Sequence, residues 1–166
     1  MSDLRIGLGT DLHCLEANLP LVIGGVSIPS PVGCRAHSDG DVLIHALIDA
    51  LFGACGQSDI GDYFPPSDPQ YKGISSLILL QHCLEIIHTE GFSIVNIDCV
   101  ISLEQPKLFL HKQIIRKNLA HHLALSIDRI GMKAKSNEAM DAIGQSLAIG
   151  AQVIVLLQKE NCITRR

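Results

Sequence analysis

Two residues of types that bind transition metals stand two positions apart near the start of the chain. Asp11 and His13 close the stretch RIGLGTDLH, whose alternation predicts a β-strand with both side chains on one face. An aspartate oxygen and a histidine nitrogen suit zinc, which also keeps open positions for water or substrate. The pair therefore indicates a metal site, although two solvated polar residues at a strand end would give the same pattern.

A second histidine, His45, provides a third candidate ligand. It lies between Asp41 and Asp49 at i, i+4 and i+8 spacing, so the three side chains follow one face of a predicted helix. A metal-binding histidine usually donates its other ring N–H to a carboxylate, and Asp41 or Asp49 could accept that bond. Together with Asp11 and His13, His45 would form a three-ligand site with an open position. The same spacing fits a surface histidine paired with acids.

The segment AHSDGD, residues 36–41, precedes this helix. Backbone N–H groups at a helix start favour an anion, and His37 and Ser38 could donate to a phosphoryl oxygen. Two aspartates here would repel a phosphate unless a cation lay between them, so the anion and metal hypotheses depend on each other. The alternative is an ordinary helix cap at Ser38 or Asp39.

Two further polar segments follow predicted strands. In EQPKL, residues 104–108, Lys107 offers a positive charge beside an apolar ledge where a nucleotide could lie. In KSNE, residues 135–138, Ser136 could hold a phosphoryl oxygen, and Glu138 is an oxygen ligand of the kind that magnesium takes together with substrate phosphates. Either segment could equally be a plain turn at the end of a strand.

Strands and helices alternate along the chain and must position these residues. The pair Gly24-Gly25 predicts a hairpin turn, and the Pro, Gly and Asp content of residues 59–69 predicts a loop. Helices interleaved with few strands favour a two-layer α+β or α/β domain. In it we expect Ile6, Leu8 and Leu12 to face the core, and the last, almost wholly apolar strand to be central. The expected strands are residues 4–12, 93–103, 129–135 and 147–157, and the expected helices are residues 41–55, 75–89 and 111–123.

Composition narrows the class of protein. The chain has 166 residues, 47% hydrophobic and 4% aromatic, which predicts one domain with an aliphatic core. A formal net charge of −4 argues against nucleic acid as a partner, though not against a single nucleotide. The apolar run LAIGAQVIVLL is too short to cross a bilayer, and the short MSDL start leaves no room for a signal peptide. Six cysteines without a CxxC pair, Cys162 among them, favour reduced thiols and a cytoplasmic protein over a disulfide framework.

The order of the motifs resembles that of one enzyme family. From Arg5 to about Lys159 the chain carries, in sequence, GTDLH, IGGVSIP, AHSDGDVLIHALIDALFGA, SDIGDYFPPSDPQYKG, NIDCVISLEQPKL and KAKSNE. This order is similar to that of the 2-C-methyl-D-erythritol 2,4-cyclodiphosphate synthases of the non-mevalonate isoprenoid pathway. The AHSDGD block and the DIG-x-x-F-P loop are its most specific parts.

The resemblance implies a fold, a reaction and an assembly. It implies an α+β two-layer domain, chorismate-mutase-like, with a mixed β-sheet covered by helices on one face, over residues 1–166 with a core of about 5–159. Family members are homotrimers with active sites between subunits. Their substrate is a small-molecule cytidine diphosphate, 4-diphosphocytidyl-2-C-methyl-D-erythritol 2-phosphate. Its 2-phosphate attacks the β-phosphorus, CMP leaves and a cyclic diphosphate remains, so the enzymes are phosphorus–oxygen lyases.

The resemblance also assigns metal ligands by position. Asp11, His13 and His45 match the ligands of zinc or another divalent transition metal, in agreement with the hypothesis from their spacing. Glu138 matches the ligand of a second divalent ion, magnesium or manganese, which is held with the substrate diphosphate.

Catalytic and substrate-binding roles follow in the same way. His37 and Ser136 match positions that stabilise the transition state. Residues 59–61 and 64–68 match the loop that holds the methylerythritol part, and residues 103–109 match the cytidine pocket. The matching substrate-binding positions are Asp11, His13, His37, Ser38, Asp59, Ile60, Gly61, Phe64, Asp68, Leu103, Pro106, Lys107, Leu108, Phe109, Lys135, Ser136, Asn137 and Glu138.

The chain departs from the family pattern at three places. Residues 135–137, Lys-Ser-Asn, replace a Thr-rich stretch, and Pro66 stands where an acid is common. After Glu138 the family has an aromatic residue, an Arg and then Gly-Glu-Gly, whereas this chain has Ala142, Gln145 and then Ser-Leu-Ala. The chain therefore lacks the arginine from which the family builds a ligand site along the trimer axis, a site for isoprenoid diphosphates.

Two other functions remain open from the sequence. A zinc-dependent phosphohydrolase could use Asp11, His13 and His45 around an activated water. A trimeric nucleotide- or isoprenoid-diphosphate-binding module without activity would fit the changed segment 142–148. Retention of every proposed metal ligand and of His37 argues against the inactive module. The hydrolase differs from the synthase in its nucleophile, a water in place of the substrate's own phosphate.

Overall fold

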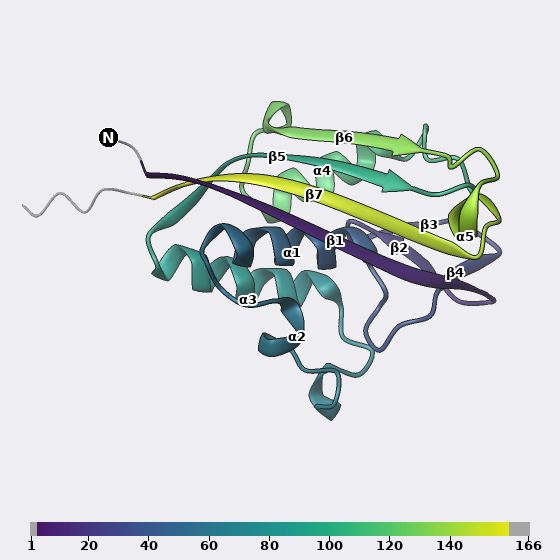
Figure 1. Ribbon diagram of the computed structural model, residues 1–166, viewed down its shortest axis with the longest axis horizontal. Coiled ribbons are helices and arrows are strands. Elements are labelled where there is room, and N and C mark those ends of the chain that lie inside the picture. Colours follow the sequence, from purple (N-terminus) through teal and green to yellow (C-terminus); the bar gives the residue numbers. More distant parts are fainter. Residues whose placement is uncertain (1–2, 160–166) are drawn as a thin grey trace, which may run out of the picture.

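A five-stranded mixed sheet forms one layer of the molecule (Figure 1). The computed structural model describes residues 3–159, and within them the strand order is β4-β1-β7-β5-β6. β5 and β6 pair in parallel, and the other neighbouring strands are antiparallel. The central place of β7 confirms the prediction from its apolar sequence. The strands are β1 (Asp3–Ala17), β4 (Val32–Cys34), β5 (Phe92–Ser102), β6 (Ile130–Lys135) and β7 (Ala148–Lys159).

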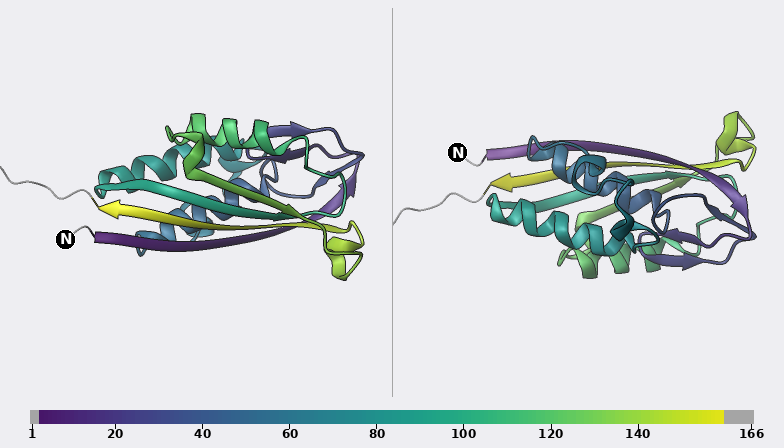
Figure 2. Two further views of the ribbon diagram at one scale, coloured as in Figure 1. Left: turned by 90° about the horizontal axis from the view of Figure 1, so that it is seen from above. Right: turned by 90° about the horizontal axis from the view of Figure 1, so that it is seen from below.

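Three long helices form the second layer, on one face of the sheet (Figure 2). α1 (Val42–Ala54) packs on β1 and β7, α3 (Ser76–Thr89) lies beside α1, and α4 (Lys112–His122) packs against β6. In the described part of the chain, the other face carries only α5 (Asp141–Gly144) at one end. The α+β, two-layer prediction is therefore confirmed. The shorter elements are α2 (Ile60–Tyr63), β2 (Leu21–Ile23), β3 (Val26–Ile28) and the 3-10 turns Pro69–Tyr71 and Ile127–Arg129.

The predicted hairpin and loop form with local detail that composition did not indicate. β2 and β3 pair across Gly24 and Gly25, whose φ angles of +59° and +73° favour glycine. The predicted loop at residues 59–69 contains the single-turn helix α2 and the start of a 3-10 turn. Cys162 and the first two residues lie outside the described residues.

The cap of α1 differs from the prediction. Asp41, rather than Ser38 or Asp39, is the N-cap residue, and its carboxylate accepts hydrogen bonds from the backbone N–H groups of Leu43 (3.2 Å) and Ile44 (3.1 Å). Asp41 is fully buried. The helix start therefore cannot offer these two N–H groups to a phosphate. The donation from His37 and Ser38 to a phosphoryl oxygen stays a prediction.

The two faces of β1 are the reverse of our expectation. Ile6, Leu8 and Leu12 do not face the core; they are 74%, 63% and 63% exposed. The glycine face packs against α1 instead, because a Cβ on Gly7 or Gly9 would lie 1.9 Å from a helix carbonyl oxygen. Alternation separates two faces of a strand, but it does not say which one a helix covers.

The bare face of the sheet is apolar over its two longest neighbouring strands. On this face Ile6 pairs with Leu156, and Leu8 pairs with Ile154. Ile154 is 51% exposed and Leu4 also 51% exposed. A continuous apolar surface of this kind usually marks a site of contact with another molecule.

Candidate active site

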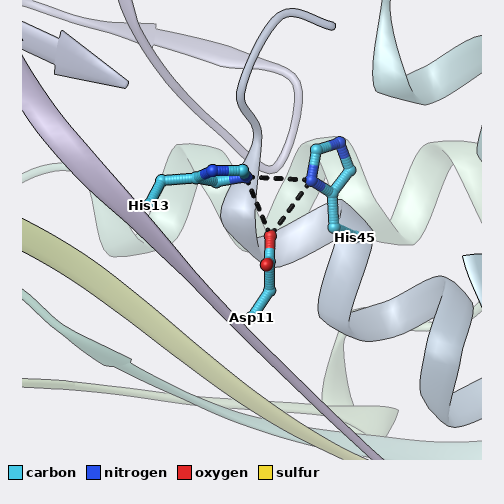
Figure 3. A group of neighbouring side chains, drawn as sticks. All are labelled: Asp11, His13 and His45. Atoms are coloured by element: carbon cyan, nitrogen blue, oxygen red, sulfur yellow. Dashed lines mark hydrogen bonds and ion pairs between the residues drawn. The ribbon is translucent and has the colours of Figure 1, made fainter. Parts of the chain in front are cut away.

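Three side chains from two elements converge on one point (Figure 3). Asp11 Oδ2 lies 2.9 Å from His13 Nε2 and 3.0 Å from His45 Nδ1, and the two ring nitrogens are 3.1 Å apart. One ligand atom from each residue lies within 4.8 Å of the others. One carboxylate oxygen and two imidazole nitrogens in this arrangement fit a divalent transition metal such as zinc.

The packing of α1 on β1 brings these side chains together. Gly7 lies against Ala50, and Gly9 lies against Ala46, so helix and strand run in opposite directions. Two residues along a strand advance roughly 6.6 Å, and four residues along a helix advance roughly 6 Å. Every second residue of β1 therefore meets every fourth residue of α1. The next step along the same face of β1 reaches Asp11 opposite the first turn of α1, where His45 lies.

The ionisation of Asp11 and of His45 is shifted in this cluster. Burial disfavours the charged carboxylate of Asp11, but hydrogen bonds from His13 and His45 outweigh burial and hold the pKa of Asp11 below its usual range. For His45, burial disfavours the imidazolium, but the hydrogen bond and charge of Asp11 outweigh it and raise the pKa. A bound cation would replace the imidazole protons as the positive charge beside the Asp11 carboxylate.

The other ring nitrogen of His45 does not meet the carboxylate we expected. Neither Asp41 nor Asp49 bonds to the ring: Asp41 caps α1, and Asp49 accepts the backbone N–H of Ile60 at 2.8 Å. His45 Nε2 instead lies 2.8 Å from Oγ of Ser76 and 3.1 Å from Oγ of Ser38. Helical spacing placed the two acids on the correct face, but their carboxylates bond to backbone N–H groups. Ser76, fully buried at the start of α3, stands in no motif and was missed.

A pocket of about 220 Å³ adjoins two of the three ligands, His13 and His45. It is lined by His37 and Ser38 from the predicted phosphoryl-binding segment and by the loop that the resemblance assigned to the methylerythritol part. Asp59 and Asp68 from that loop do not line it: Asp59 caps α2, and Asp68 caps the following turn. The predicted residues in its wall are His13, His37, Ser38, His45, Ile60, Gly61 and Phe64.

A second pocket, of about 290 Å³, lies where β5 and β6 end. Three lysines, Lys107, Lys112 and Lys135, give it positive charge, and a hydrogen bond from Lys107 to Glu104 (3.1 Å) fixes the first of them. The predicted residues in its wall are Leu103, Lys107, Leu108, Phe109, Lys135 and Ser136.

The remaining predicted residues lie beside this second pocket. Ser136 donates to the Glu138 carboxylate at 2.7 Å, and Asn137 donates to Asp141 at 3.0 Å. Pro106 follows Gln105 through a cis peptide bond and is not in the pocket wall. No residue lines both pockets, so within one chain the structure does not join His37 to Ser136.

The fold and the site define a class of protein: a two-layer α+β domain with a carboxylate and two histidines at the edge of a pocket. The model of the YgbB family matches residues 4–158. The chain belongs to this family, the 2-C-methyl-D-erythritol 2,4-cyclodiphosphate synthases.

Named relatives agree in sequence and structure. A chloroplastic 2-C-methyl-D-erythritol 2,4-cyclodiphosphate synthase of Arabidopsis thaliana is 44% identical over 94% of this chain and 68% of its own length. A synthase of Clostridium botulinum is 46% identical over 93% of this chain and 99% of its own length. A solved structure of a 2C-methyl-D-erythritol-2,4-cyclodiphosphate synthase in a form bound to CDP has a TM-score of 0.86 and 40% identity, covering 92% of this chain and 99% of its own.

Proposed function

We propose that this chain converts 4-diphosphocytidyl-2-C-methyl-D-erythritol 2-phosphate to 2-C-methyl-D-erythritol 2,4-cyclodiphosphate and CMP. The observation that carries the proposal is the convergence of Asp11, His13 and His45 beside the pocket of His37, in a chain of this family. The 2-phosphate oxygen forms a bond to the β-phosphorus, and the bond from that phosphorus to the CMP oxygen breaks with its electron pair. The substrate carries its own nucleophile, so the chain needs no nucleophilic side chain.

The residues of the first pocket would hold and orient the reacting phosphates. A bound zinc ion, or another divalent transition metal, supplies charge that polarises a phosphoryl oxygen. Asp11, His13 and His45 would hold that ion, and His37 and Ser38 would donate hydrogen bonds to phosphoryl oxygens from the same wall.

The second pocket would hold the cytidine end. The CDP-bound relative is a synthase with a cytidine nucleotide, which suits a pocket with an apolar floor and three lysines. Lys107 and Lys135 would face the phosphates, and Leu103, Leu108 and Phe109 would lie against the base or ribose. Ser136 would stabilise the transition state, and Glu138 would hold the second divalent ion, magnesium or manganese, with the diphosphate.

A ring of copies would unite the two pockets. The first pocket lies beside β1, and the second lies at the ends of β5 and β6, on opposite sides of the central β7. A closed head-to-tail ring would bring one chain's second pocket to its neighbour's first, and a homotrimer is the smallest such ring of more than two. The bare apolar face, with Ile6, Leu8 and Ile154, would be buried at its centre.

The remaining parts of the proposal concern class, extent and location. The reaction makes the chain a phosphorus–oxygen lyase, and residues 1–166 would act as one such domain. No helix among the described residues is long and apolar enough to span a membrane. We propose a cytoplasmic site of action, because the five described cysteines are free. The Arabidopsis relative, by its name, is chloroplastic.

Phosphorus NMR of the purified protein with this substrate, zinc and magnesium tests the reaction. CMP and a cyclic diphosphate in equal amounts are the expected products. CMP with ring-opened phosphate products would instead mean that a metal-bound water attacks, as in a phosphohydrolase. Unchanged substrate in a protein that holds zinc would mean a binding module without activity.

A further inference from the structure

His45 is the ligand whose second ring nitrogen meets a chain of hydrogen bonds that extends away from the metal centre. Its Nε2 lies 2.8 Å from Ser76 Oγ, and Ser76 Oγ bonds in turn to a carboxylate oxygen of Asp39. The chain joins three elements: α1, the start of α3 and the loop before α1. None of these contacts involves an atom that faces the metal centre, so a bound ion would leave them intact.

The direction of this chain follows from its members. An ionised carboxylate can only accept, so the single hydroxyl proton of Ser76 goes to Asp39. The Ser76 oxygen is then free only to accept from His45, which requires a proton on Nε2. A neutral imidazole carries one ring proton, so Nδ1, which points at Asp11 and His13, is left with a lone pair. That lone pair is what a metal ion needs.

We propose that Asp39 and Ser76 are positioning residues for the metal centre: they hold His45 in the Nε2–H tautomer with the Nδ1 lone pair facing the ion. This inference rests on the proposed function only in that Asp11, His13 and His45 bind a metal. Burial of the bond between His45 and Ser76 supports it, because Ser76 is fully buried and His45 has only 12% of its side chain exposed, while Asp39 is half-buried. Without Ser76, the buried imidazole N–H would keep only the longer contact with Ser38 Oγ, at 3.1 Å, and a poorly satisfied buried donor is costly.

A purely structural role is the alternative, and the contacts show how to separate the two. Asp39 also accepts the backbone N–H of Ser76 at 2.8 Å and of Asp41 at 3.2 Å, so its carboxylate helps to start α3 as well. The N-cap residue Ser75 makes no side-chain cap bond, so Asp39 supplies this acceptor from another segment. Asp39→Asn keeps one oxygen for the backbone of α3 but places an amide N–H₂ beside Ser76. The amide then donates to Ser76, whose proton turns toward His45 and favours the wrong tautomer.

Zinc affinity measures this effect directly. We expect Asp39→Asn to raise the zinc dissociation constant of the purified protein by about 10–100-fold, measured by competition with a chromophoric chelator. Ser76→Ala should raise it as well, whereas Ser75→Ala, at the neighbouring serine without a side-chain cap bond, should leave it unchanged. Thermal unfolding of the metal-free proteins shows how much each change affects the fold alone.

A spectroscopic measurement reads the tautomer itself. In the zinc-loaded wild type, proton NMR should show a downfield, slowly exchanging Nε2–H resonance of His45, absent from His45→Gln. In Asp39→Asn this proton should exchange faster, because Ser76 no longer accepts it. If Asp39→Asn had the same zinc affinity and the same Nε2–H exchange as the wild type, the positioning role of Asp39 and Ser76 would be overturned. A wild type that binds no zinc would overturn both the metal site and the positioning role of Asp39 and Ser76. Zinc binding without CMP release would overturn the proposed reaction but not this positioning role.

Discussion

Gly9 and Ala46 set how closely the first helix lies on the first strand. A Cβ on Gly9 would lie 1.9 Å from the Ala46 carbonyl oxygen and 2.6 Å from the Ala50 backbone nitrogen. Both contacts are with backbone, which cannot turn aside as a side chain can. The metal centre is therefore built on a close strand–helix contact, and His45 lies one residue before Ala46.

Gly9→Ala should separate the helix from the strand and disturb the centre. We expect a loss of about 1–3 kcal/mol in the free energy of unfolding, because overpacking forces the backbone to shift. Chemical denaturation of the metal-free protein measures this loss, and the zinc dissociation constant should rise with it. Gly53→Ala is the matched control, because a Cβ there meets nothing within 4 Å. Equal stability of Gly9→Ala and Gly53→Ala would contradict the close contact.

His45→Ala should remove the metal and nearly abolish turnover. Loss of a ligand should weaken zinc binding by more than the roughly 10–100-fold that loss of an outer hydrogen-bond partner costs. Metal analysis after gel filtration, with turnover measured on the same sample, checks both effects. His88→Ala, at an exposed histidine of α3, should change neither. Normal zinc content in His45→Ala would mean that His45 is not a ligand.

Glu138→Gln should weaken binding of the second divalent ion without affecting zinc. The amide keeps the size of the side chain but removes the charge, so activity should need more magnesium or manganese while zinc content stays unchanged. Turnover as a function of magnesium concentration, with zinc analysis alongside, makes the test. If zinc content changed instead, the assignment of Glu138 to a separate ion would be wrong.

The metal-free protein should show a pH-dependent contribution from the centre. Asp11 has a pKa below its ordinary value of 3.8, so its contribution to stability is present above 3.8 and is lost as the pH falls through the folded pKa. His45 has a pKa above its ordinary value of 6.5, so its contribution is present below 6.5 and is lost as the pH rises through the folded pKa. Between pH 3.8 and pH 6.5 both contributions to stability are therefore present in full.

The difference in unfolding free energy between wild type and His45→Gln measures this contribution. Without metal, it should be larger at about pH 5 than at about pH 9. Zinc must displace the His45 proton, so its affinity should weaken as the pH falls toward 6.5. A difference that stayed the same at both pH values would show that the carboxylate and imidazole do not interact as an ion pair.

Leu8→Asp should break the proposed ring. Leu8 lies 63% exposed on the bare sheet face, where three buried carboxylates would be costly. Analytical ultracentrifugation should show a trimer for wild type and monomers for the variant, with turnover lost because the two pockets no longer meet. Ile78→Asp, on α3 at 47% exposure and away from the bare sheet face, should leave the trimer intact. A trimeric Leu8→Asp variant would place the contact on another face.

The sequence predicted the helices and strands well, but it predicted only some of the residues that meet at the metal centre. Apolar periodicity located α1, α3, α4 and the central β7 to within a few residues. It could not choose the covered face of β1, because Ile6 and Leu8 are as apolar as a core strand requires, yet the glycines lie under α1. That choice depends on how closely a helix can approach each face of the strand, and apolar periodicity carries no information about this distance.

Local spacing determined which residues of this protein could bind a metal, and tertiary packing decided how they are held. Asp11 and His13 share a face because side chains alternate along any strand, so the sequence alone determined that pair. Only the fold brought His45 to them, 34 residues beyond Asp11, and only the fold gave His45 the buried hydroxyl of Ser76 instead of a carboxylate from its own helix. Contacts between distant segments depend on the arrangement of whole elements, whereas spacing within one element is fixed by backbone geometry.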